Sequence, residues 1–252
     1  MKKIGITGSR GFIGRHFIEA LKSKKNVRLS FFDLPEHNLL KLDKTLEKFV
    51  GGKNVIVHAG AINRGTDTEV IAGSVVATYN LISAIKKTKS RAKLIFLSSI
   101  QAETGTLYGQ SKKLTEIMLE DFSKERKTPV SIFRLTNVFG QGGRPFYNSV
   151  SATFCHQVAN GKELIIHPES RNKKLNLIYV KDAVELIVRE AFIKRKKPFY
   201  FKRVSSKNII SISDLAKLIV SFKNIDNPRK LKSKFHKDLY KTYLSYQHKS
   251  AL

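Results

Sequence analysis

The segment that most constrains the fold lies near the N-terminus, where glycines stand at positions 8, 11 and 14. An apolar run, residues 3–7, precedes them, and an amphipathic stretch, residues 12–21, follows. A strand, a glycine-spaced turn and a helix in this order form the loop that binds a dinucleotide's pyrophosphate. The glycines let backbone amides approach the phosphates and let the helix pack on the strand. The helix N-terminus then faces the phosphates with unpaired N–H groups.

The apolar runs after this loop are short, rich in β-branched residues and alternate with helical patterns. We predict strands over residues 3–7, 27–32, 54–58, 93–98 and 130–135, and helices near 12–22, 43–50, 68–88 and 107–125. Strands that alternate with helices of this length indicate parallel βαβ units. The predicted fold class is therefore α/β, a doubly wound parallel sheet of the Rossmann type.

The pattern changes after residue 139, where a glycine-rich loop begins. Further on we predict helices near 149–160, 181–193 and 211–222, and strands at 164–167 and 175–180. The predicted domains are a dinucleotide-binding domain, 1–139 with 175–193 packed back on it, and a small C-terminal lobe, 140–174 with 194–252. We expect the lobe to cover the carboxyl edge of the sheet, where such folds bind ligands, and to bind substrate. The final stretch, 238–252, shows no evident cap or core and is expected to be loosely held.

The net charge of +27 is high for 252 residues. Residues 194–252 hold sixteen Lys or Arg against three Asp. A nucleic-acid partner, attraction of an anionic substrate, and an acidic membrane surface are three explanations. A lysine-rich solvated surface is the fourth, and we favour it because the basic residues are scattered singly without interleaved aromatics. A nucleic-acid partner is not expected.

The cysteine content and the hydropathy of the chain constrain its cellular compartment. A single cysteine, Cys155, excludes an internal disulfide and fits a reducing environment. Arg10 and Arg15 interrupt what would be the apolar part of a signal peptide. No run approaches the roughly 18 apolar residues that span a bilayer. We therefore expect a cytoplasmic protein with no membrane span, and we predict no metal site.

Tyr108 and Lys112 stand four residues apart at the start of a predicted helix and hence on one face. Their location matters more than their spacing, because the preceding strand ends at Ser99. A nearby ammonium lowers the pKa of a phenol from about 10 toward neutrality, and a serine hydroxyl can hold a carbonyl or a developing alkoxide. The three residues therefore predict a proton-transfer site suited to ketone reduction. The alternative has Tyr108 packed on the sheet and Lys112 in solvent.

Together these segments resemble the extended short-chain dehydrogenase/reductases, which comprise nucleotide-sugar epimerases, dehydratases and reductases. The matching motifs are Thr7-Gly8-x-x-Gly11-x-x-Gly14, His58-Ala59-Gly60, Ser99, Tyr108-x-x-x-Lys112 and Arg134-x-x-Asn137-Val138-Phe139-Gly140. A narrower likeness is to the reductase domains of capsular-polysaccharide enzymes that reduce a 4-keto UDP-2-acetamido-dideoxy sugar. It is carried by residues 98–102, 147–150, 152–155, 177–180 and 238–246.

The resemblance implies roles for individual residues. Tyr108 would donate the proton, Lys112 would be its partner and anchor the nicotinamide ribose, and Ser99 would hold the carbonyl oxygen. The implied cofactor-binding residues are Gly8, Arg10, Gly11, Phe12, Ile13, Gly14, Asp33, Ala59, Gly60 and Lys112. Asn137 would lie near the nucleotide-sugar diphosphate. Arg144 would clamp a phosphate, since a planar guanidinium suits bidentate contact, or it is an ordinary loop arginine.

The chain departs from the family pattern at Ser74, where the family usually has asparagine, and this would weaken a proton relay or water site. The cofactor evidence conflicts. Asp33 ends the second predicted strand, where a carboxylate binds the ribose 2′-hydroxyl of NAD and repels the 2′-phosphate of NADP. The subfamily's basic residue at the position of Arg10 favours NADP. The cofactor is NAD or NADP, with a slight preference for NAD.

The favoured function is an NAD(P)-dependent reductase of a UDP sugar in surface-polysaccharide biosynthesis. A nucleotide-sugar 4-epimerase uses the same three residues and stays open. A 4,6-dehydratase is disfavoured because Ile100 and Gln101 follow the serine instead of an acidic pair. A non-catalytic dinucleotide- or nucleic-acid-binding protein would not need both Tyr108 and Lys112. The related enzyme continues into a cupin-type epimerase domain, so we expect that step to be absent or supplied by a separate epimerase; a homodimer is a further expectation.

Overall fold

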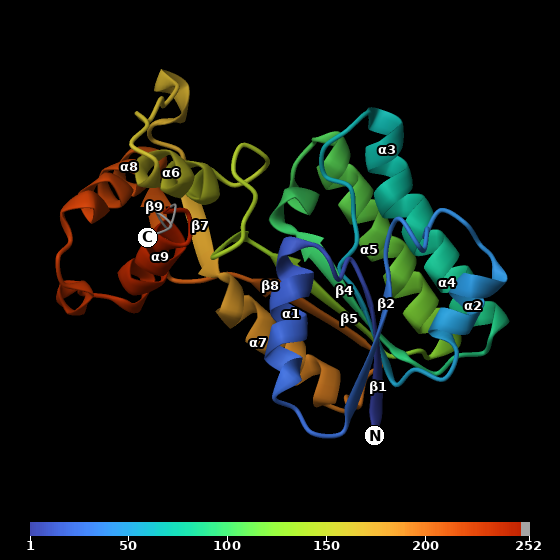
Figure 1. The fold of residues 1–252 in the computed structure, drawn as a ribbon. Coiled ribbons are helices and arrows are strands. Elements are labelled where there is room, and N and C mark those ends of the chain that lie inside the picture. The colour runs from blue at the N-terminus through green and yellow to red at the C-terminus, as the bar shows by residue number, and fades with distance from the viewer. Residues whose placement is uncertain (248–252) are drawn as a thin grey trace. The chain divides into compact units, whose positions relative to one another are not determined.

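The structure is a computed structural model, and it describes residues 1–247. The chain forms two compact units, which we treat separately (Figure 1). Unit 1 consists of Met1–Leu135 and Val184–Val204, and unit 2 consists of Thr136–Ala183 and the chain from Ser205 onward.

Unit 1 is built on a six-stranded, fully parallel sheet with the order β2-β1-β3-β4-β5-β8. The strands are β1 (Lys2–Thr7), β2 (Val27–Phe32), β3 (Val55–His58), β4 (Lys93–Ser99), β5 (Val130–Leu135) and β8 (Phe199–Val204). The helices are α1 (Phe12–Lys22), α2 (Lys44–Val50), α3 (Asp67–Ile71), α4 (Ala77–Lys87), α5 (Leu107–Arg126) and, from Val184 onward, α7 (Val180–Phe192). Figure 1 shows α1 and α7 on one face and α2, α4 and α5 on the other. The predicted doubly wound α/β fold is confirmed.

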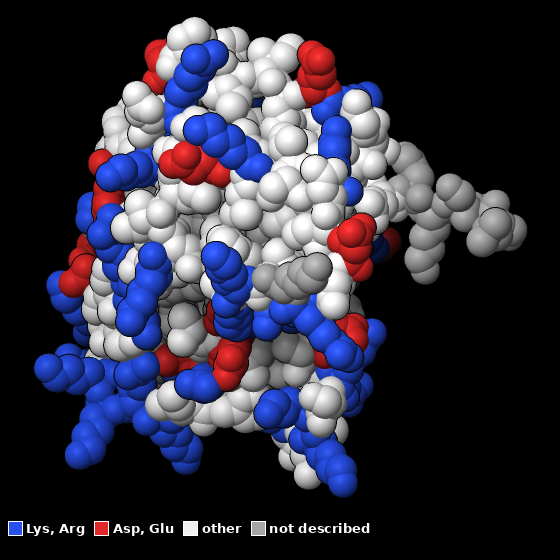
Figure 2. All heavy atoms as spheres, turned by 90° about the vertical axis from the view of Figure 1, so that its left-hand side faces the viewer, with Lys and Arg blue, Asp and Glu red and all other residues white. Residues whose placement is uncertain are grey.

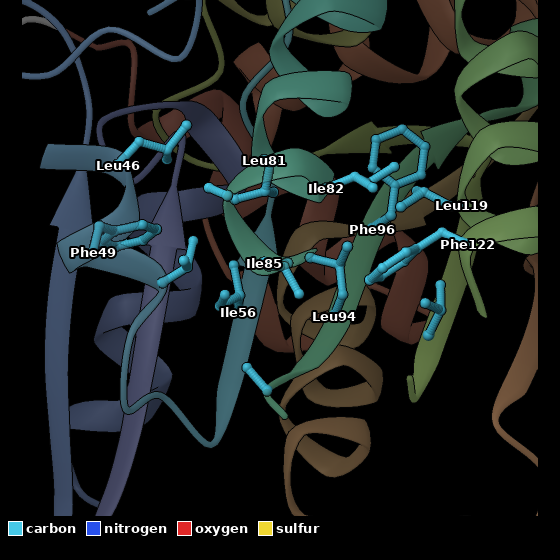
Figure 3. Packing of buried hydrophobic residues seen from close by; sticks show 14 of the residues in the cluster. Leu46, Phe49, Ile56, Leu81, Ile82, Ile85, Leu94, Phe96, Leu119 and Phe122 are labelled. Atoms are coloured by element: carbon cyan, nitrogen blue, oxygen red, sulfur yellow. The ribbon is translucent and has the colours of Figure 1, made fainter. Parts of the chain in front are cut away.

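The core of unit 1 lies between the sheet and the helices α2, α4 and α5 (Figure 3). Side chains such as Phe49, Leu81 and Phe122 meet Ile56 and Phe96 from the strands, and none is more than 7% exposed. Each such side chain contributes about 1.5–3 kcal/mol on burial. A parallel sheet covered on both faces requires strands that are apolar throughout, which explains the short β-branched runs of the sequence.

All six strands end at one edge of the sheet, which we call the carboxyl edge. The register pairs Thr7 with both Phe32 and His58, and it pairs Leu135 with both Ser99 and Val204. The glycine loop and the residue after β2 therefore follow strand ends at the same edge. The segments after β3 and β4 do so as well.

The observed division of the chain differs from the predicted one around the last strand of unit 1. Residues 194–204 belong to unit 1, because β8 pairs with β5 from Val130–Phe199 to Leu135–Val204. Unit 2 begins at Thr136, and β7 (Lys174–Tyr179) lies in its own sheet. Half-buried and exposed side chains alternate along most of Phe199–Val204, as in an edge strand. Only the pairing with β5 distinguishes this segment from a loop.

Unit 2 holds a small sheet in which β7 pairs with β6 (Asn137–Phe139) in parallel and with β9 (Ile209–Ser211) antiparallel. Three helices accompany it: α6 (Val150–Ala159), α8 (Ile212–Ser221) and α9 (Lys234–Leu244). The strand predicted at residues 164–167 is wrong. Within residues 1–247 this run pairs with no strand, and Ile165 is 81% exposed.

The expectation of a loosely held end is also wrong for the described part. Helix α9 starts at the N-cap Ser233, whose hydroxyl accepts a hydrogen bond from the His236 N–H. The Asp238 carboxylate is buried and pairs with Lys234 and Lys241 at 2.9 and 3.1 Å. Because the cap residue Ser233 lies before the stretch 238–252, that stretch alone does not show it. Residues 248–252 lie outside the described residues.

One described helical segment, Asp67–Lys87, is long and apolar enough to cross a membrane by length and composition. It comprises α3, the π-helical turn η1 (Ala72–Val76) and α4. Half of its most apolar window is buried inside the fold, and its residues Leu81 and Ile85 belong to the core of unit 1. Core helices meet the same two criteria, so this segment is weak evidence for a membrane span.

Candidate active site

The glycine loop between β1 and α1 is shaped by close backbone contacts. Gly8 has φ of +74°, and a Cβ atom on it would lie 2.5 Å from the amide nitrogen of Gly60. A Cβ on Gly14 would clash with the carbonyl oxygen of Gly8 and lie 2.9 Å from the Cα of Ser9. Only glycine fits at these two positions. The loop after β1 therefore lies directly against the segment after β3.

The N-terminus of α1 follows this loop. Gly11 is the N-cap, and in the described chain neither a side-chain cap nor an acidic residue is present in the first turn. The unpaired N–H groups and the positive end of the helix dipole favour an anion at this point. Gly11 itself donates a hydrogen bond to the Gly8 carbonyl at 3.1 Å, which tightens the turn.

Asp33, directly after β2, holds the glycine loop. Its carboxylate accepts hydrogen bonds from the backbone N–H groups of Gly8 and Ser9 and from the Ser9 hydroxyl. Arg10 points to the residues beyond Asp33, where it donates to the Leu34 carbonyl at 2.7 Å and pairs with Glu36 at 2.9 Å. Hydrogen bonding by Arg10 lowers the pKa of Glu36. Asp33, whose position favours NAD, and Arg10, whose position favours NADP, are therefore both bonded to other residues of the chain.

His58, at the end of β3, is completely buried between two threonines. Its Nδ1 lies 2.7 Å from Thr7 Oγ1, and its Nε2 lies 3.0 Å from Thr78 Oγ1. Thr78 donates its single hydroxyl hydrogen to the Ser74 carbonyl, so it accepts from Nε2–H, and Nδ1 accepts from Thr7. Burial, and secondarily the charge of Lys112, lowers the pKa of His58 to about 3. The neutral imidazole links β1 and β3 to α4.

The predicted catalytic residues lie where β4 meets α5. Ser99 ends β4, and its hydroxyl accepts a hydrogen bond from the Gln101 N–H at 3.2 Å. Tyr108 and Lys112 occupy the first two turns of α5, and the Lys112 ammonium lies 5.9 Å from the Tyr108 ring centre. Helix α5 starts at the N-cap Thr106. The predicted shared face of Tyr108 and Lys112 is present.

Lys112 is buried, 3% exposed, so the alternative that placed it in solvent is wrong. Its ammonium donates to the Leu97 carbonyl at 3.1 Å and lies 4.5 Å from the ring centre of Phe96. Burial lowers the pKa of Lys112 to about 7, although the charge of Glu116 acts in the opposite direction. A cation is thus held at the end of β4 close to its titration point.

A partly buried ion network next to these residues was not anticipated from the sequence. Glu116 accepts from the Ser98 hydroxyl at 2.6 Å and from Arg134 through both carboxylate oxygens. Arg134 also pairs with Glu103 at 2.9 Å, and Arg203 pairs with Glu103 at 3.0 Å. The network joins the ends of β4, β5 and β8 to α5. The one indication of this network in the sequence is that Arg134 lies in a motif that resembles the family's.

Ser74 lies in the π-helical turn η1, where the backbone departs from α-helical bonding. Its hydroxyl is buried and has no hydrogen-bond partner in the described chain. A buried orphan hydroxyl carries a cost that an ordered water can remove.

The two residues predicted to bind substrate, Asn137 and Arg144, belong to unit 2. Asn137 starts β6, and its side-chain amide donates to the Asn176 carbonyl at 3.3 Å. Arg144 lies in the loop before α6 with its guanidinium carbon 4.9 Å from the Tyr147 ring centre. No group of three or more His, Cys, Asp or Glu side chains within residues 1–247 is arranged to hold a metal ion.

The features of unit 1 define a Rossmann-type α/β protein with a glycine loop and a Ser, Tyr and Lys set after its fourth strand. The chain belongs to the NAD-dependent epimerase/dehydratase family, whose model matches residues 4–191. This confirms the family resemblance seen in the sequence motifs.

One similar protein is the UDP-2-acetamido-2,6-beta-L-arabino-hexul-4-ose reductase of Pseudomonas aeruginosa. It is 30% identical over 97% of this chain, and the chain spans 64% of its length. A second is the capsular polysaccharide assembling protein CapF of Staphylococcus aureus, whose crystal structure has a TM-score of 0.76 at 30% identity. That match covers 97% of this chain and 64% of CapF.

Solved structures of lower sequence identity share the fold of this chain. The UDP-glucuronic acid 4-epimerase of Bacillus cereus, solved with NAD, has a TM-score of 0.84 at 18% identity. The match covers 97% of this chain and 98% of that one. At this identity the likeness establishes the shared Rossmann-type fold.

Proposed function

We propose that the chain is an NAD(P)-dependent oxidoreductase that reduces a 4-keto UDP-deoxy-amino sugar in surface-polysaccharide biosynthesis. The observation that carries the proposal is the burial of the Lys112 ammonium beside the Tyr108 ring at the end of β4. A cation held there suits a phenol that must give up a proton, because the positive charge stabilises the phenolate. The names of the Pseudomonas aeruginosa and Staphylococcus aureus relatives support the substrate class and the pathway.

The residues around the glycine loop fit a dinucleotide. Gly8 and Gly14 leave no room for a Cβ atom, so the loop packs tightly on neighbouring backbone, and the uncapped N-terminus of α1 suits a pyrophosphate. The residues proposed to hold the cofactor are Gly8, Arg10, Gly11, Phe12, Ile13, Gly14, Asp33, Ala59, Gly60 and Lys112. When bound, the dinucleotide supplies the hydride for the carbonyl carbon.

The side chains of the chain supply the proton. In the proposal Ser99 donates a hydrogen bond to the carbonyl oxygen, which polarises it and stabilises the negative charge that develops. Tyr108 then donates its phenolic proton to that oxygen. The Lys112 ammonium stabilises the phenolate that forms, since it is buried and little screened by water. Asn137 and Arg144 are proposed to bind the diphosphate of the nucleotide sugar.

NAD is the proposed cofactor form. Glu36 pairs with Arg10, so the guanidinium is already neutralised at the end of β2. A 2′-phosphate would meet the carboxylates of Asp33 and Glu36 against one arginine. A ribose 2′-hydroxyl carries no charge and avoids this repulsion.

A nucleotide-sugar 4-epimerase is the second candidate, because it would use Ser99, Tyr108 and Lys112 in the same positions. Cytoplasmic localisation, a homodimer and a separate epimerase partner stay predictions. The test of function mixes purified protein with a panel of UDP-4-keto sugars and follows the absorbance of NADH and NADPH. Stoichiometric oxidation of the cofactor supports the reductase. A second incubation, with NAD and UDP sugars that carry a 4-hydroxyl group, tests the epimerase, for which inversion at C4 without net change of the cofactor is expected. No reaction in either incubation overturns both.

A further inference from the structure

Charge is divided unevenly between the two edges of the sheet in unit 1. The segments that precede the six strands at the amino edge are residues 1, 23–26, 51–54, 88–92, 127–129 and 193–198. They contain no Asp or Glu and ten basic residues: Lys24, Lys25, Lys53, Lys89, Arg91, Lys127, Lys194, Arg195, Lys196 and Lys197. We call these six segments the basic edge.

The carboxyl edge of the same sheet is different. The segments 8–11, 33–43, 59–66 and 100–106, which follow β1 to β4, contain three basic and four acidic residues. A lysine-rich composition alone would raise the charge of both edges. Attraction of an anionic substrate would require positive charge at the carboxyl edge, where the catalytic set lies. Neither explanation accounts for the basic edge.

The segments of the basic edge form one continuous surface. Backbone hydrogen bonds join them in the order of the strands: Lys2 to Asn26, Asn54 to Lys3, Lys93 to Asn54, Leu94 to Pro129 and Val130 to Pro198. Six strands at about 4.8 Å spacing make this surface roughly 24 Å wide. Figure 2 shows Lys and Arg outnumbering Asp and Glu at the lower end of the view, the level of the N-terminus in Figure 1.

Most of this charge is not neutralised within the protein. Arg195 pairs with Glu190, and in the described chain the other nine residues of the basic edge form no ion pair. Lysines of the adjoining helix ends do have partners, as in the pairs Lys86–Glu125 and Lys87–Glu47. Positive charge at helix ends also complements the helix dipole, but that effect is confined to the last turn. It does not account for residues such as Lys197.

Like charges repel at this edge. Burial, and then the charges of Lys93 and Lys194, lowers the pKa of Lys2. Burial, and then the charges of Lys3 and Arg28, lowers the pKa of Lys53. An anionic partner would remove this repulsion.

Exposed apolar side chains lie in the basic edge and at the end of α7, which leads into it. Met1, Phe192 and Ile193 are 74%, 41% and 46% exposed. The Lys2 ammonium lies 4.7 Å from the Phe192 ring centre, which brings the two chain segments together. Apolar side chains surrounded by lysines are typical of surfaces that lie on an anionic bilayer.

We propose that the basic edge binds the surface of an anionic phospholipid membrane, with Met1, Phe192 and Ile193 entering the interface. Nucleic acid fits less well. Eight of the ten basic residues are Lys, which lacks the bidentate geometry of Arg. Binding through the amino edge leaves the catalytic set at the opposite edge of the sheet.

The experiment is co-sedimentation of the full chain with vesicles of phosphatidylcholine, with and without about a third phosphatidylglycerol. We expect binding to the anionic vesicles only, with affinity that falls as salt rises above 0.1 M, where the Debye length is about 10 Å. Duplex and single-stranded DNA are titrated under the same conditions.

Two triple variants with the same charge change make the test specific. The first is Lys194→Gln, Lys196→Gln and Lys197→Gln, and the control is Lys207→Gln, Lys223→Gln and Lys237→Gln in unit 2. Each lysine near an anionic surface adds about fivefold to binding, so the first triple should bind about a hundredfold more weakly. The control should bind as the unmodified chain does. Ile193→Ser should weaken binding without a change in net charge.

Three outcomes would overturn the proposal: no binding to anionic vesicles, equal losses in both triple variants, or tighter binding to DNA than to the vesicles. Cofactor oxidation is measured on every variant. Because the substituted residues lie away from the catalytic set, a loss of vesicle binding with normal oxidation is distinct from a failure of the proposed reductase.

Discussion

The ammonium nitrogen of Lys112 lies 3.1 Å from the carbonyl oxygen of Leu97. This contact anchors the lysine of α5 to strand β4, two residues before Ser99. It keeps the cation near the Tyr108 ring although burial disfavours the charge. The position of one backbone carbonyl on β4 therefore contributes to the geometry of the proposed proton donor.

Replacing the proposed proton donor tests the site. Tyr108→Phe should lower turnover by about a hundredfold or more, the scale of a lost general acid, and leave cofactor affinity nearly unchanged. Turnover is measured by cofactor oxidation and affinity by fluorescence titration. Tyr79→Phe, at a 60% exposed position of α4, is the matched control. Unchanged turnover in Tyr108→Phe would contradict the assignment.

The Arg10–Glu36 pair provides a test of cofactor preference. Glu36→Gln removes the carboxylate that holds Arg10, so affinity for NADPH should rise by about tenfold while affinity for NADH changes little. Glu19→Gln, which breaks the exposed pair with Lys22, is the control. A protein that already prefers NADPH strongly would refute the role given to Glu36.

The close backbone contacts of the glycine loop can be tested by alanine substitution. Gly14→Ala should abolish dinucleotide binding or unfold the protein, because the added Cβ meets the backbone of Gly8 and Ser9. Gly105→Ala is the control, since its Cβ would have no heavy atom within 4 Å. Circular dichroism and cofactor titration distinguish the two effects. Normal binding by Gly14→Ala would show that the loop differs from the one described.

His58 gives the stability a defined pH dependence. Its pKa falls from 6.5 to about 3 on folding, so the unfolded chain binds the proton more readily. The free energy of unfolding should therefore decrease as the pH falls from 6.5 toward 3, by up to about 1.4 kcal/mol per pH unit. His58→Gln should reduce this slope, whereas the exposed His167→Gln should not. Urea denaturation at several pH values measures both slopes, and equal slopes for His58→Gln and the unmodified chain would exclude this role.

The Arg134–Glu116 pair should stabilise the fold far more than surface pairs do. Arg134→Leu leaves the buried Glu116 without its main partner and should cost about 3–5 kcal/mol of unfolding free energy. Arg189→Leu breaks an exposed pair with Glu185 and should cost less than about 1 kcal/mol. Denaturant titration of the two variants provides the comparison. Similar losses would mean that the network contributes little.

Part of the fold could be read from local patterns. The bounds predicted for β2, β5 and α1 coincide with those observed, because short β-branched runs and amphipathic helices depend on neighbouring residues. The strand predicted at 164–167 is wrong because a strand depends on a pairing partner elsewhere in the chain. The loose end predicted for 238–252 is wrong over residues 238–247 because the cap of their helix, Ser233, lies before residue 238.

By itself the sequence determined the features whose residues are close along the chain: the glycine spacing at 8, 11 and 14, and the shared face of Tyr108 and Lys112. Backbone geometry over one or two turns suffices for these. Only the tertiary structure decided that Asp33 holds the glycine loop, that Lys112 is buried and that β8 completes the sheet. The tertiary structure also brought together the six separate segments of the basic edge. These relationships join residues tens of positions apart, and the packing and strand order that bring them together leave no periodic signal in the sequence.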